Sequence, residues 1–328
     1  MDRQSLGEGP ITSVAPLSGG TQNILIAFAR AGRRYVLRRP AVHVPANGNE
    51  TMRKEMRVLA ALASTDVPHP RLIASCPETD VLGASFYLME RIDGFNVTVG
   101  MPARHASDPA IRRAMGFSLI DGLVRLGRVD HLAVGLGDLG KADGFLERQV
   151  SRWRGQLEGY SVHVGWQGPK DLPGVDRIGK WLTHNCPGSF RPGIMHGDYH
   201  LANVLFKTDG PRLAAVVDWE LATIGDPLLD LGLVLTTWPR ADDSTSMKIE
   251  PWDGFPDVDE LETAYATGSD RDLSSLPWYV VLACFKLGIL LEGTHARACA
   301  GKADSGVGAR FHARTVALFE RALRLVSA

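Results

Sequence analysis

A chain of 328 residues exceeds the length over which one hydrophobic core usually keeps growing, so we expect two lobes or domains. An apolar content of 45%, a charged content of 22% and a formal net charge of −1 fit a soluble globular protein and argue against nucleic acid as its main partner. The four cysteines are scattered without a C-x-x-C pair, which suggests neither a zinc site nor a disulfide framework and favours a reducing cytoplasm.

The first third of the chain predicts a small mixed lobe. Residues 1–10 are polar and lack the apolar region of a signal peptide. Apolar residues at helical spacing predict a helix over residues 51–63. The pairs Ala31-Gly32 and Asp93-Gly94 mark turns beside apolar runs. Strands are predicted at 24–28, 35–39, 71–74 and 84–90.

The rest of the chain predicts a mainly helical region with short strands in its middle. Residues 276–291 are strongly apolar, but Lys286 interrupts them and they are too few for a bilayer span, so we expect a buried helix and no membrane insertion. Residues 301–308 are expected to form a mobile loop. Helices are predicted at 110–127, 145–160, 258–267, 277–298 and 309–326, and short strands at 204–206 and 213–217.

Two polar segments in this region carry the strongest chemical signal. They read His196-Gly-Asp-Tyr-His-Leu-Ala-Asn203 and Val216-Val-Asp-Trp-Glu220. Phosphoryl transfer needs a carboxylate that orients the attacking hydroxyl and takes its proton, and oxygen ligands that hold Mg²⁺ against the nucleotide phosphates. Asp198, Asn203 and Asp218 offer such a set, and the apolar run before Asp218 predicts a buried strand that delivers it to a cleft.

These segments resemble the catalytic core of the kinase-like phosphotransferases, the superfamily of aminoglycoside phosphotransferases and choline kinases. The resemblance implies that Asp198 is the catalytic base and that Asn203 and Asp218 are Mg²⁺ ligands. It also implies a two-lobed α+β fold. A small nucleotide-binding lobe with an antiparallel sheet and a helix would span residues 1–94, and a larger, mainly helical lobe with the catalytic loop and the acceptor site would span residues 95–328.

The same resemblance implies that the N-terminal lobe binds ATP. An Arg stands where the general kinase pattern has a strand lysine; it can do the same electrostatic work, although its reach and geometry differ. The implied nucleotide-binding residues are Ser18, Gly19 and Gly20 in the phosphate-covering loop, Arg38 with its helix partner Glu55, and Met89 and Arg91 at the hinge, where backbone groups would bind adenine.

Further polar residues near the motif have alternative interpretations. His196 is expected to pack beneath the catalytic loop rather than act as a second base. His200 is expected to be an ordinary loop histidine, the alternative being that it faces the acceptor. Glu220 either aids positioning of metal or substrate or faces solvent. Asp226, before Pro227, suits a helix N-cap, and together with Asp230 is expected to be architectural.

The match extends to one branch of the superfamily, which includes the kinase-like domain fused to acyl-CoA dehydrogenases. Residues 86–91, 147–153 and 278–297 carry this resemblance, and in that branch an Arg at the strand position is normal. The branch implies phosphorylation of a hydroxyl group on a small molecule, with hydroxyacyl metabolites as suggested acceptors. Fold analogy alone does not identify a substrate.

Three other functions remain open. An aminoglycoside phosphotransferase needs an acidic acceptor pocket, whereas this region also carries Arg148, Arg152, Arg154 and Arg297, which suit an anionic substrate better. A non-catalytic, nucleotide-binding pseudokinase is motivated by Arg38 in place of lysine. No residue of the sequence distinguishes ATP-dependent phosphorylation from the use of GTP or from transfer of a nucleotidyl group.

Overall fold

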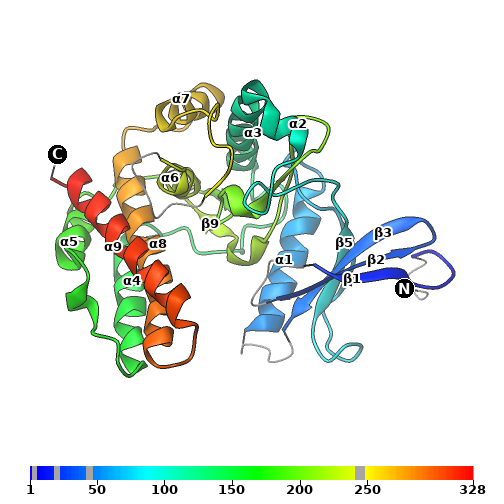
Figure 1. The fold of residues 1–328 in the computed structure, drawn as a ribbon, viewed down its shortest axis with the longest axis horizontal. Coiled ribbons are helices and arrows are strands. Elements are labelled where there is room, and N and C mark those ends of the chain that lie inside the picture. Colours follow the sequence, from blue (N-terminus) through cyan, green and yellow to red (C-terminus); the bar gives the residue numbers. More distant parts are fainter. Residues whose placement is uncertain (2–5, 18–22, 42–46, 241–247, 328) are drawn as a thin grey trace.

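The computed structural model describes residues 1, 6–17, 23–41, 47–240 and 248–327. A sheet and helix α1 (Gly48–Leu62) form an N-terminal part that lies to one side of a mainly helical C-terminal part (Figure 1). All neighbouring strands in the sheet are antiparallel, and their order is β1-β2-β3-β5-β4. The strands are β1 (Thr12–Pro16), β2 (Asn23–Arg30), β3 (Arg33–Pro40), β4 (Leu72–Cys76) and β5 (Phe86–Glu90). This is the α+β, two-lobed arrangement that the sequence predicts.

Strand β1 is an addition to the four strands predicted for this sheet. All five of its residues are exposed, and their sequence, TSVAP, lacks the alternation of apolar and polar residues that predicts a strand. The predicted hairpin is present, with β2 and β3 paired from Asn23↔Pro40 to Arg30↔Arg33. Its two turn residues, Ala31 and Gly32, have φ values of 49° and 73°, as a two-residue hairpin turn requires.

Helix α1 packs against the sheet with its apolar face. Met52, Leu59 and Leu62 are at most 1% exposed, which confirms the predicted helical spacing. The buried carboxylate of Glu55 lies on the same helix. Since a buried charge needs a partner, the Glu55 carboxylate requires a cation from the sheet at this position.

The C-terminal part consists of eight α-helices and two short antiparallel strand pairs within the described residues. The helices are α2 (Ala103–Ser107), α3 (Pro109–Arg128), α4 (Glu147–Gly159), α5 (Val175–His184), α6 (Leu228–Thr237), α7 (Val258–Gly268), α8 (Leu276–Cys299) and α9 (Ser305–Leu325). The pairs are β6 (Gly193–Met195) with β9 (Thr223–Gly225), and β7 (Val204–Phe206) with β8 (Leu213–Val216).

The predicted helices are all present, but the predicted loop at 301–308 is partly wrong. Helix α9 begins at Ser305, and the Asp304 side chain accepts a hydrogen bond from the backbone N–H of Val307 at 2.8 Å. This N-cap satisfies a backbone donor of the first turn and lets the helix start within a glycine-rich segment. Helices α2 and α5 and strands β6 and β9 were not predicted, because each is short.

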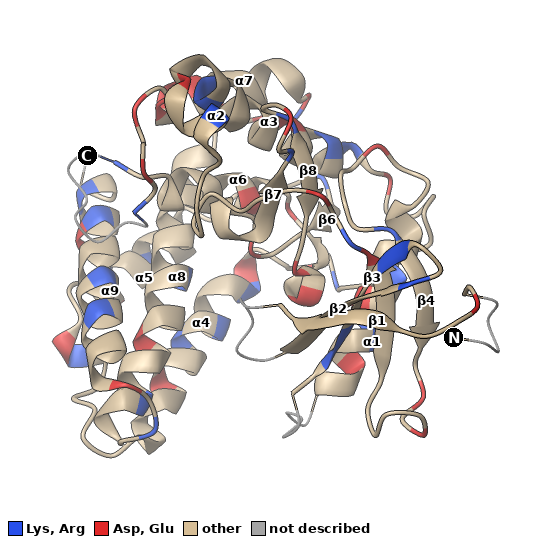
Figure 2. Ribbon diagram, turned by 45° about the vertical axis from the view of Figure 1, so that its right-hand side comes forward, with Lys and Arg blue, Asp and Glu red and all other residues tan. Residues whose placement is uncertain are grey.

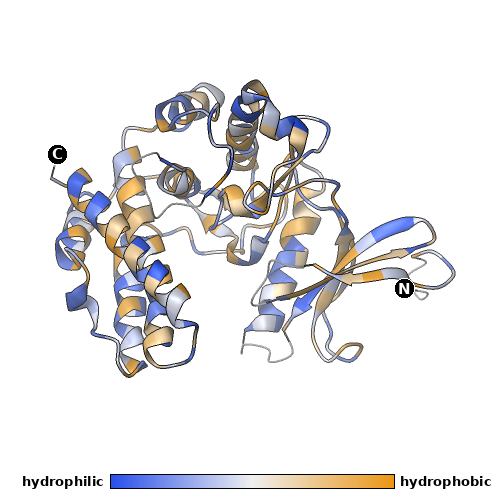
Figure 3. Cartoon of the chain, viewed as in Figure 1, coloured by the Kyte–Doolittle hydropathy of each residue, from blue (hydrophilic) through white to orange (hydrophobic). Residues whose placement is uncertain are grey.

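Helix α8 is the centre of the C-terminal part and is coloured mostly hydrophobic in Figure 3. Among the described residues it is the one helix long and apolar enough to cross a membrane, yet 67% of its most apolar window is buried within the fold. Phe285 and Ile289 are fully buried. The burial is what the sequence predicts for a core helix. Lys286 of the same helix points its ammonium group to the catalytic segment, as described below.

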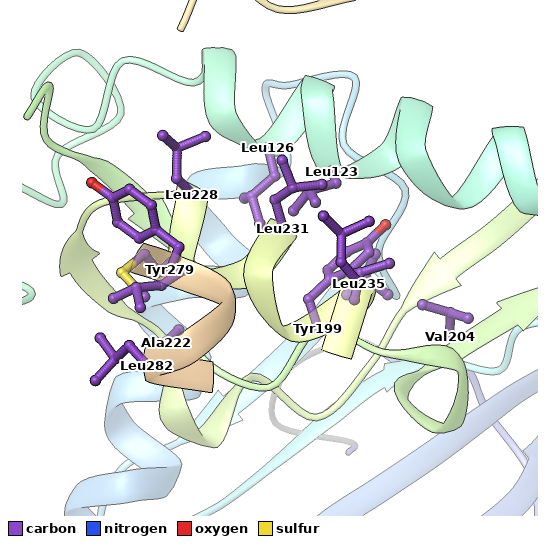
Figure 4. Packing of buried hydrophobic residues seen from close by; sticks show 14 of the residues in the cluster. Leu123, Leu126, Tyr199, Val204, Ala222, Leu228, Leu231, Leu235, Tyr279 and Leu282 are labelled. Atoms are coloured by element: carbon purple, nitrogen blue, oxygen red, sulfur yellow. The ribbon is translucent and has the colours of Figure 1, made fainter. Parts of the chain in front are cut away.

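The loop between β6 and β7 is held by the same core. Figure 4 shows Tyr199 of this loop among leucines of α3 and α6. Its ring is fully buried, and its hydroxyl donates a hydrogen bond to the carbonyl oxygen of Leu119 at 2.8 Å. One residue after Asp198, the chain is therefore fixed to α3, which gives the loop a rigid base.

Candidate active site

Asp198 and Asn203 lie against each other in the loop that joins β6 to β7. The Asn203 side-chain amide donates to the carboxylate of Asp198 at 2.8 Å and to its backbone oxygen at 2.9 Å. Both contacts use the amide nitrogen, so the Asn203 side-chain oxygen takes no part in them. The five-residue spacing of the motif thus closes a small loop by hydrogen bonds from Asn203 to Asp198.

Buried partners hold the start of this loop. Gly197 has φ +84°, and a Cβ there would lie 2.6 Å from the backbone oxygen of Leu221, so only glycine fits. The Asp230 carboxylate accepts from the backbone N–H groups of His196 at 2.6 Å and of Gly197 at 2.9 Å. Asp230 thus anchors the loop, in line with its expected architectural role.

Asp226 also serves the architecture of this region. It is buried and accepts from the backbone N–H of Leu228 at 3.0 Å and from the Tyr279 hydroxyl. Helix α6 begins at Leu228, and its N-cap residue is Pro227. Asp226 therefore lies one position before the N-cap, whereas the sequence predicted Asp226 as the N-cap and Pro227 as the first helical residue. It still satisfies a donor of the first turn while it ties α6 to α8.

His196 is fully buried and hydrogen-bonded on both ring nitrogens. Its Nε2 donates to the carbonyl oxygen of Val217 at 2.9 Å, and its Nδ1 accepts from the backbone N–H of Asp198 at 3.2 Å. Burial lowers the pKa of His196 to about 4, so the ring is neutral near pH 7. These two hydrogen bonds connect the two motif segments and give His196 a structural role beneath the loop.

This burial leads to a testable pH dependence. The unfolded ring titrates near 6.5 and the folded ring near 4, so the unfolded state binds the extra proton first. The corresponding stability is present above about pH 6.5 and is lost as the pH falls to about 4, which amounts to about 3 kcal/mol of unfolding free energy. Urea denaturation at several pH values should show this loss in the wild type and a shallower one in His196→Asn. Equal slopes for both proteins would contradict a buried neutral ring.

Asp218 stands at the end of β8 in a left-handed backbone conformation, with φ 67° and ψ 62°. Such a conformation is costly for a residue other than glycine and tends to occur at functional sites. One carboxylate oxygen is 2.5 Å from an Arg38 guanidinium nitrogen, and the side chain is 38% exposed. Asp218 is thus oriented by Arg38 of the sheet and remains partly accessible to solvent.

Arg38 joins the N-terminal sheet to both Glu55 and Asp218. Its Nε lies 2.9 Å from the Glu55 carboxylate, and a terminal nitrogen donates to the same group at 3.2 Å. Burial opposes the charge, but the carboxylates raise the pKa of Arg38 further above its usual value. Burial likewise raises the pKa of Glu55, despite Arg38, and the Tyr87 hydroxyl donates to Glu55 at 2.6 Å. The strand Arg and the helix Glu predicted as partners are in contact.

Sequence reasoning underrated His200, which contacts Asp198 directly. His200 Nε2 is 3.3 Å from a carboxylate oxygen of Asp198, while its Nδ1 accepts from the backbone N–H of Ala202 at 3.2 Å. The second contact leaves the proton on Nε2, so this nitrogen donates to Asp198. A histidine two residues after an aspartate in a tight loop is a weak signal, because only the loop's fold brings the two side chains together.

Lys286 adds a positive charge behind the loop. Its ammonium group donates to the carbonyl oxygen of Gly197 at 2.5 Å and lies 5.7 Å from the ring centroid of Trp153. Burial favours the neutral form of Asp198, but the hydrogen bond from His200 and the charge of Lys286 keep the pKa of Asp198 below its usual value. Asp198 is therefore a carboxylate near pH 7 and accepts hydrogen bonds.

Glu220 lies on the same side as Asp218, and its carboxylate accepts a hydrogen bond from the Asn23 side chain at 3.0 Å. A cavity of about 210 Å³ opens here between the start of β2, the end of β3, the start of α1 and η5 (Trp219–Leu221), with Lys54 and Glu220 in its lining. Glu220 therefore faces a cavity rather than bulk solvent. Ligand oxygens of Glu55, Asp218 and Glu220 lie within 4.8 Å of one another.

The other predicted nucleotide-binding residues lie partly outside and partly within the described residues. Ser18, Gly19 and Gly20 lie outside the described residues, in the connection between β1 and β2. Met89 is nearly buried in β5, which ends at Glu90, and Arg91 is exposed just after it. The chain enters the C-terminal part a few residues later, where Phe95 pairs with Phe206. Met89 and Arg91 thus flank the link between the two parts.

A basic pocket lies in the helical part of the fold, between α4 and the start of β9. It measures about 550 Å³ and is lined by Lys141, Arg148, Arg152 and Thr223, among others. Thr223 pairs with Met195, the residue before the His196 segment. Figure 2 shows Lys and Arg positions along α4, which supplies the two arginines. The pocket is thus cationic and lies beside the strand pair that leads into the catalytic segment.

The chain is similar in sequence to known proteins. The family profile described as phosphotransferase enzyme family matches residues 13–268. The chain is 28% identical over 326 residues to acyl-CoA dehydrogenase family member 11 of Gallus gallus, covering 95% of this chain and 40% of that protein. With acyl-CoA dehydrogenase family member 10 of Mus musculus it shares 27% over 298 residues, covering 87% and 26%. The chain therefore spans less than half the length of these relatives.

Two solved structures show the fold. A putative aminoglycoside phosphotransferase from Ralstonia eutropha JMP134 superposes with a TM-score of 0.81 at 28% identity, over 98% of this chain and 93% of that one. A thermostable mutant of aminoglycoside phosphotransferase APH(4)-Ia, in a ternary complex with ADP and hygromycin B, superposes with a TM-score of 0.63 at 16% identity, over 95% of each chain. At the second identity the likeness concerns the fold alone.

Proposed function

Because the chain belongs to the phosphotransferase enzyme family, we propose that it transfers the γ-phosphoryl group of ATP, with Mg²⁺, to a hydroxyl group of a small anionic molecule. The observation that carries this proposal is that Asp198 contacts Asn203 and Arg38 contacts Asp218, while the backbone N–H of Val217, next to Asp218, donates to the carbonyl oxygen of Asn203 at 2.9 Å. These residues come from a loop, a strand end and the N-terminal sheet, and a scaffold has no need of them together. The proposed lobes, 1–94 and 95–328, meet at this point.

Each residue has a role that follows from its contacts. Asp198, ionised and held by Asn203 and His200, would accept a hydrogen bond from the acceptor hydroxyl and take its proton as the phosphoryl group arrives. The Asn203 side-chain oxygen and the exposed Asp218 carboxylate would hold Mg²⁺, which supplies positive charge against the phosphates when bound. Arg38 keeps Asp218 oriented and is within reach of the same phosphates.

The nucleotide would lie between the sheet and the catalytic loop. The cavity beside Lys54 and Glu220 supports a phosphate position near Arg38, since Glu220 is 3.7 Å from the Arg38 guanidinium group. The adenine would contact the backbone around Met89 and Arg91, at the link between the lobes. Ser18, Gly19 and Gly20 keep their proposed role as the loop over the phosphates.

The acceptor would occupy the basic pocket. Lys141, Arg148 and Arg152 favour an anionic molecule over a polycationic aminoglycoside, because like charges would be forced together in the second case. The names of the relatives point to acyl-CoA chemistry, although this chain matches only part of their length. We therefore place a hydroxyacyl compound, as a free acid or a thioester, first among acceptors.

The test is nucleotide consumption across hydroxy acids, hydroxyacyl thioesters, choline, sugars and aminoglycosides, with ATP or GTP and Mg²⁺. We expect turnover with an anionic hydroxy compound. Arg152→Gln should raise KM for that acceptor by about 10-fold or more and change KM for ATP little, because one charge-assisted contact in the pocket is lost. Arg154→Gln is the matched control on α4, since Arg154 pairs with Asp176 and does not line the pocket.

Other outcomes would point elsewhere. Turnover with aminoglycosides alone would show that the acceptor assignment is wrong while the reaction class stands. Bound ATP without turnover of any acceptor class would favour the pseudokinase alternative. Equal effects of Arg152→Gln and Arg154→Gln would remove the basic pocket from the acceptor site.

A further inference from the structure

A second cluster of ligand-type side chains begins six residues after Lys286 on α8, where α8 and α9 pack together. It consists of Glu292 and His295 on α8 and His312 on α9, each of which offers one ligand atom within 4.8 Å of the others. Glu292 and His295 are three residues apart and share one face of the helix. Figure 1 shows α8 and α9 side by side, so the cluster bridges two neighbouring helices.

Glu292 has one carboxylate oxygen already fixed. The side chain is 1% exposed, and the Trp166 indole N–H donates to its Oε1 at 2.7 Å. His312 Nδ1 lies 3.0 Å from the other oxygen, Oε2, and 3.2 Å from Oε1. A buried carboxylate that accepts from an indole N–H has the outer-sphere support that metal-ligating carboxylates usually have.

His295 presents a nitrogen to the same space. Its Nε2 lies 3.5 Å from the Cys299 sulfur, whereas its Nδ1 is buried and has no hydrogen-bond partner among the described residues. A Cβ built at Gly308 of α9 would lie 3.8 Å from this Nδ1, so the nitrogen faces α9. The ring centroids of His295 and His312 are 4.3 Å apart. An unpartnered nitrogen so close to a second imidazole lacks the group that would satisfy it.

We propose that Glu292, His295 and His312 bind a divalent transition-metal ion of the zinc class. Two imidazoles and a carboxylate are a frequent zinc ligand set, and the borderline-soft nitrogens disfavour Mg²⁺. Ligand atoms around tetrahedral zinc lie roughly 3.3–3.8 Å apart. His312 Nδ1 and Glu292 Oε2, now 3.0 Å apart, would separate slightly, and because all ligand atoms lie within 4.8 Å no pair would close in by more than about 1.5 Å. The His312 side chain is 26% exposed, which leaves an entry path for the ion.

The ion would tie α8 to α9 beside the turn that joins them. It is separate from the phosphotransferase site, whose proposed ligands Asn203 and Asp218 are oxygen groups. The four scattered cysteines do not indicate this metal site, because its proposed ligands are two histidines and a glutamate on two helices. Without metal, Glu292 and His312 form a partly buried contact with each other, and the experiment must distinguish the two states.

The test uses the full chain without a polyhistidine tag, stripped of metal by a chelator and dialysed against Zn²⁺. We expect one bound zinc ion that persists in Asp218→Asn and is lost in His295→Gln and in His312→Gln. Zn²⁺ should also raise the melting temperature of the wild type by about 5 °C at saturating metal and leave that of His295→Gln unchanged. Bound Co²⁺ should give the intense visible absorption of a tetrahedral site.

His131→Gln is the matched control, because this histidine lies in the segment after α3 and outside the cluster. It should bind zinc as the wild type does. Circular dichroism of each variant confirms that loss of metal is not loss of fold. Equal zinc content in the wild type and in the double variant His295→Gln/His312→Gln would overturn the proposal and leave the cluster as a buried hydrogen-bonded contact.

Discussion

Replacement of Asp198 by Asn should lower turnover by about 10³-fold while the dissociation constant for ATP changes little. The amide cannot take the proton of the acceptor hydroxyl, but its oxygen can still accept the hydrogen bond from the Asn203 side chain. The loop is also held by Tyr199 and Asp230, so its fold should survive the change. Steady-state ATP consumption and calorimetric nucleotide binding are the two measurements.

Asp209→Asn provides the matched control, since Asp209 is an exposed aspartate in the turn between β7 and β8. It should leave turnover and ATP binding at the wild-type level. Turnover of Asp198→Asn within a few-fold of the wild type would show that Asp198 is not the base. Loss of ATP binding in parallel with turnover would instead place Asp198 at the metal or the phosphates.

The environment of Asp198 indicates when proton transfer takes place. Its pKa is held below the usual value, as described above, so it is a weak base towards a free hydroxyl. In a loose phosphoryl-transfer transition state the hydroxyl becomes acidic only as its bond to phosphorus forms. A low-pKa carboxylate is then suited to orient the hydroxyl first and to take the proton late. His200 and Lys286 would act as positioning residues in this step.

The parts of the site that the sequence predicts are those carried by short, contiguous patterns. Asp198 and Asn203 are five residues apart, and the tight loop that the motif implies brings them into contact. Met52, Leu59 and Leu62 follow the helical period and are buried as expected. In both cases local spacing determines which groups meet, and no long-range contact is needed to infer it.

The parts it misses depend on chain segments that are distant in sequence. Arg38 and Asp218 are separated by 180 positions, and their contact follows from the placement of the sheet over the catalytic loop. In the sequence, Lys286 only interrupts an apolar helix. In the fold, its ammonium group donates a hydrogen bond to the carbonyl oxygen of Gly197. His312 is likewise twenty positions from Glu292 and reaches it only across a helix pair.

Replacement of Arg38 by Met should destabilise the fold as well as stop the reaction. The Arg38 side chain is 6% exposed and that of Glu55 is 0%, so removal of the cation leaves a buried carboxylate without a counter-charge. We expect the unfolding free energy to fall by about 3–5 kcal/mol. Turnover should fall by about 10²-fold or more, since no cation then orients Asp218. Urea denaturation and steady-state kinetics measure the two effects.

The double variant Arg38→Met/Glu55→Gln separates the two roles. Gln can still accept the hydrogen bond from Tyr87 but carries no charge, so the double variant should recover stability to within about 1–2 kcal/mol of the wild type. Turnover should stay low, because the missing cation acts on Asp218 and the phosphates rather than on Glu55. If the double variant were as unstable as Arg38→Met, the buried charge of Glu55 would not be the cause. Recovery of turnover along with stability would mean that Arg38 serves only to neutralise Glu55, and that the cation of this active site must be sought elsewhere.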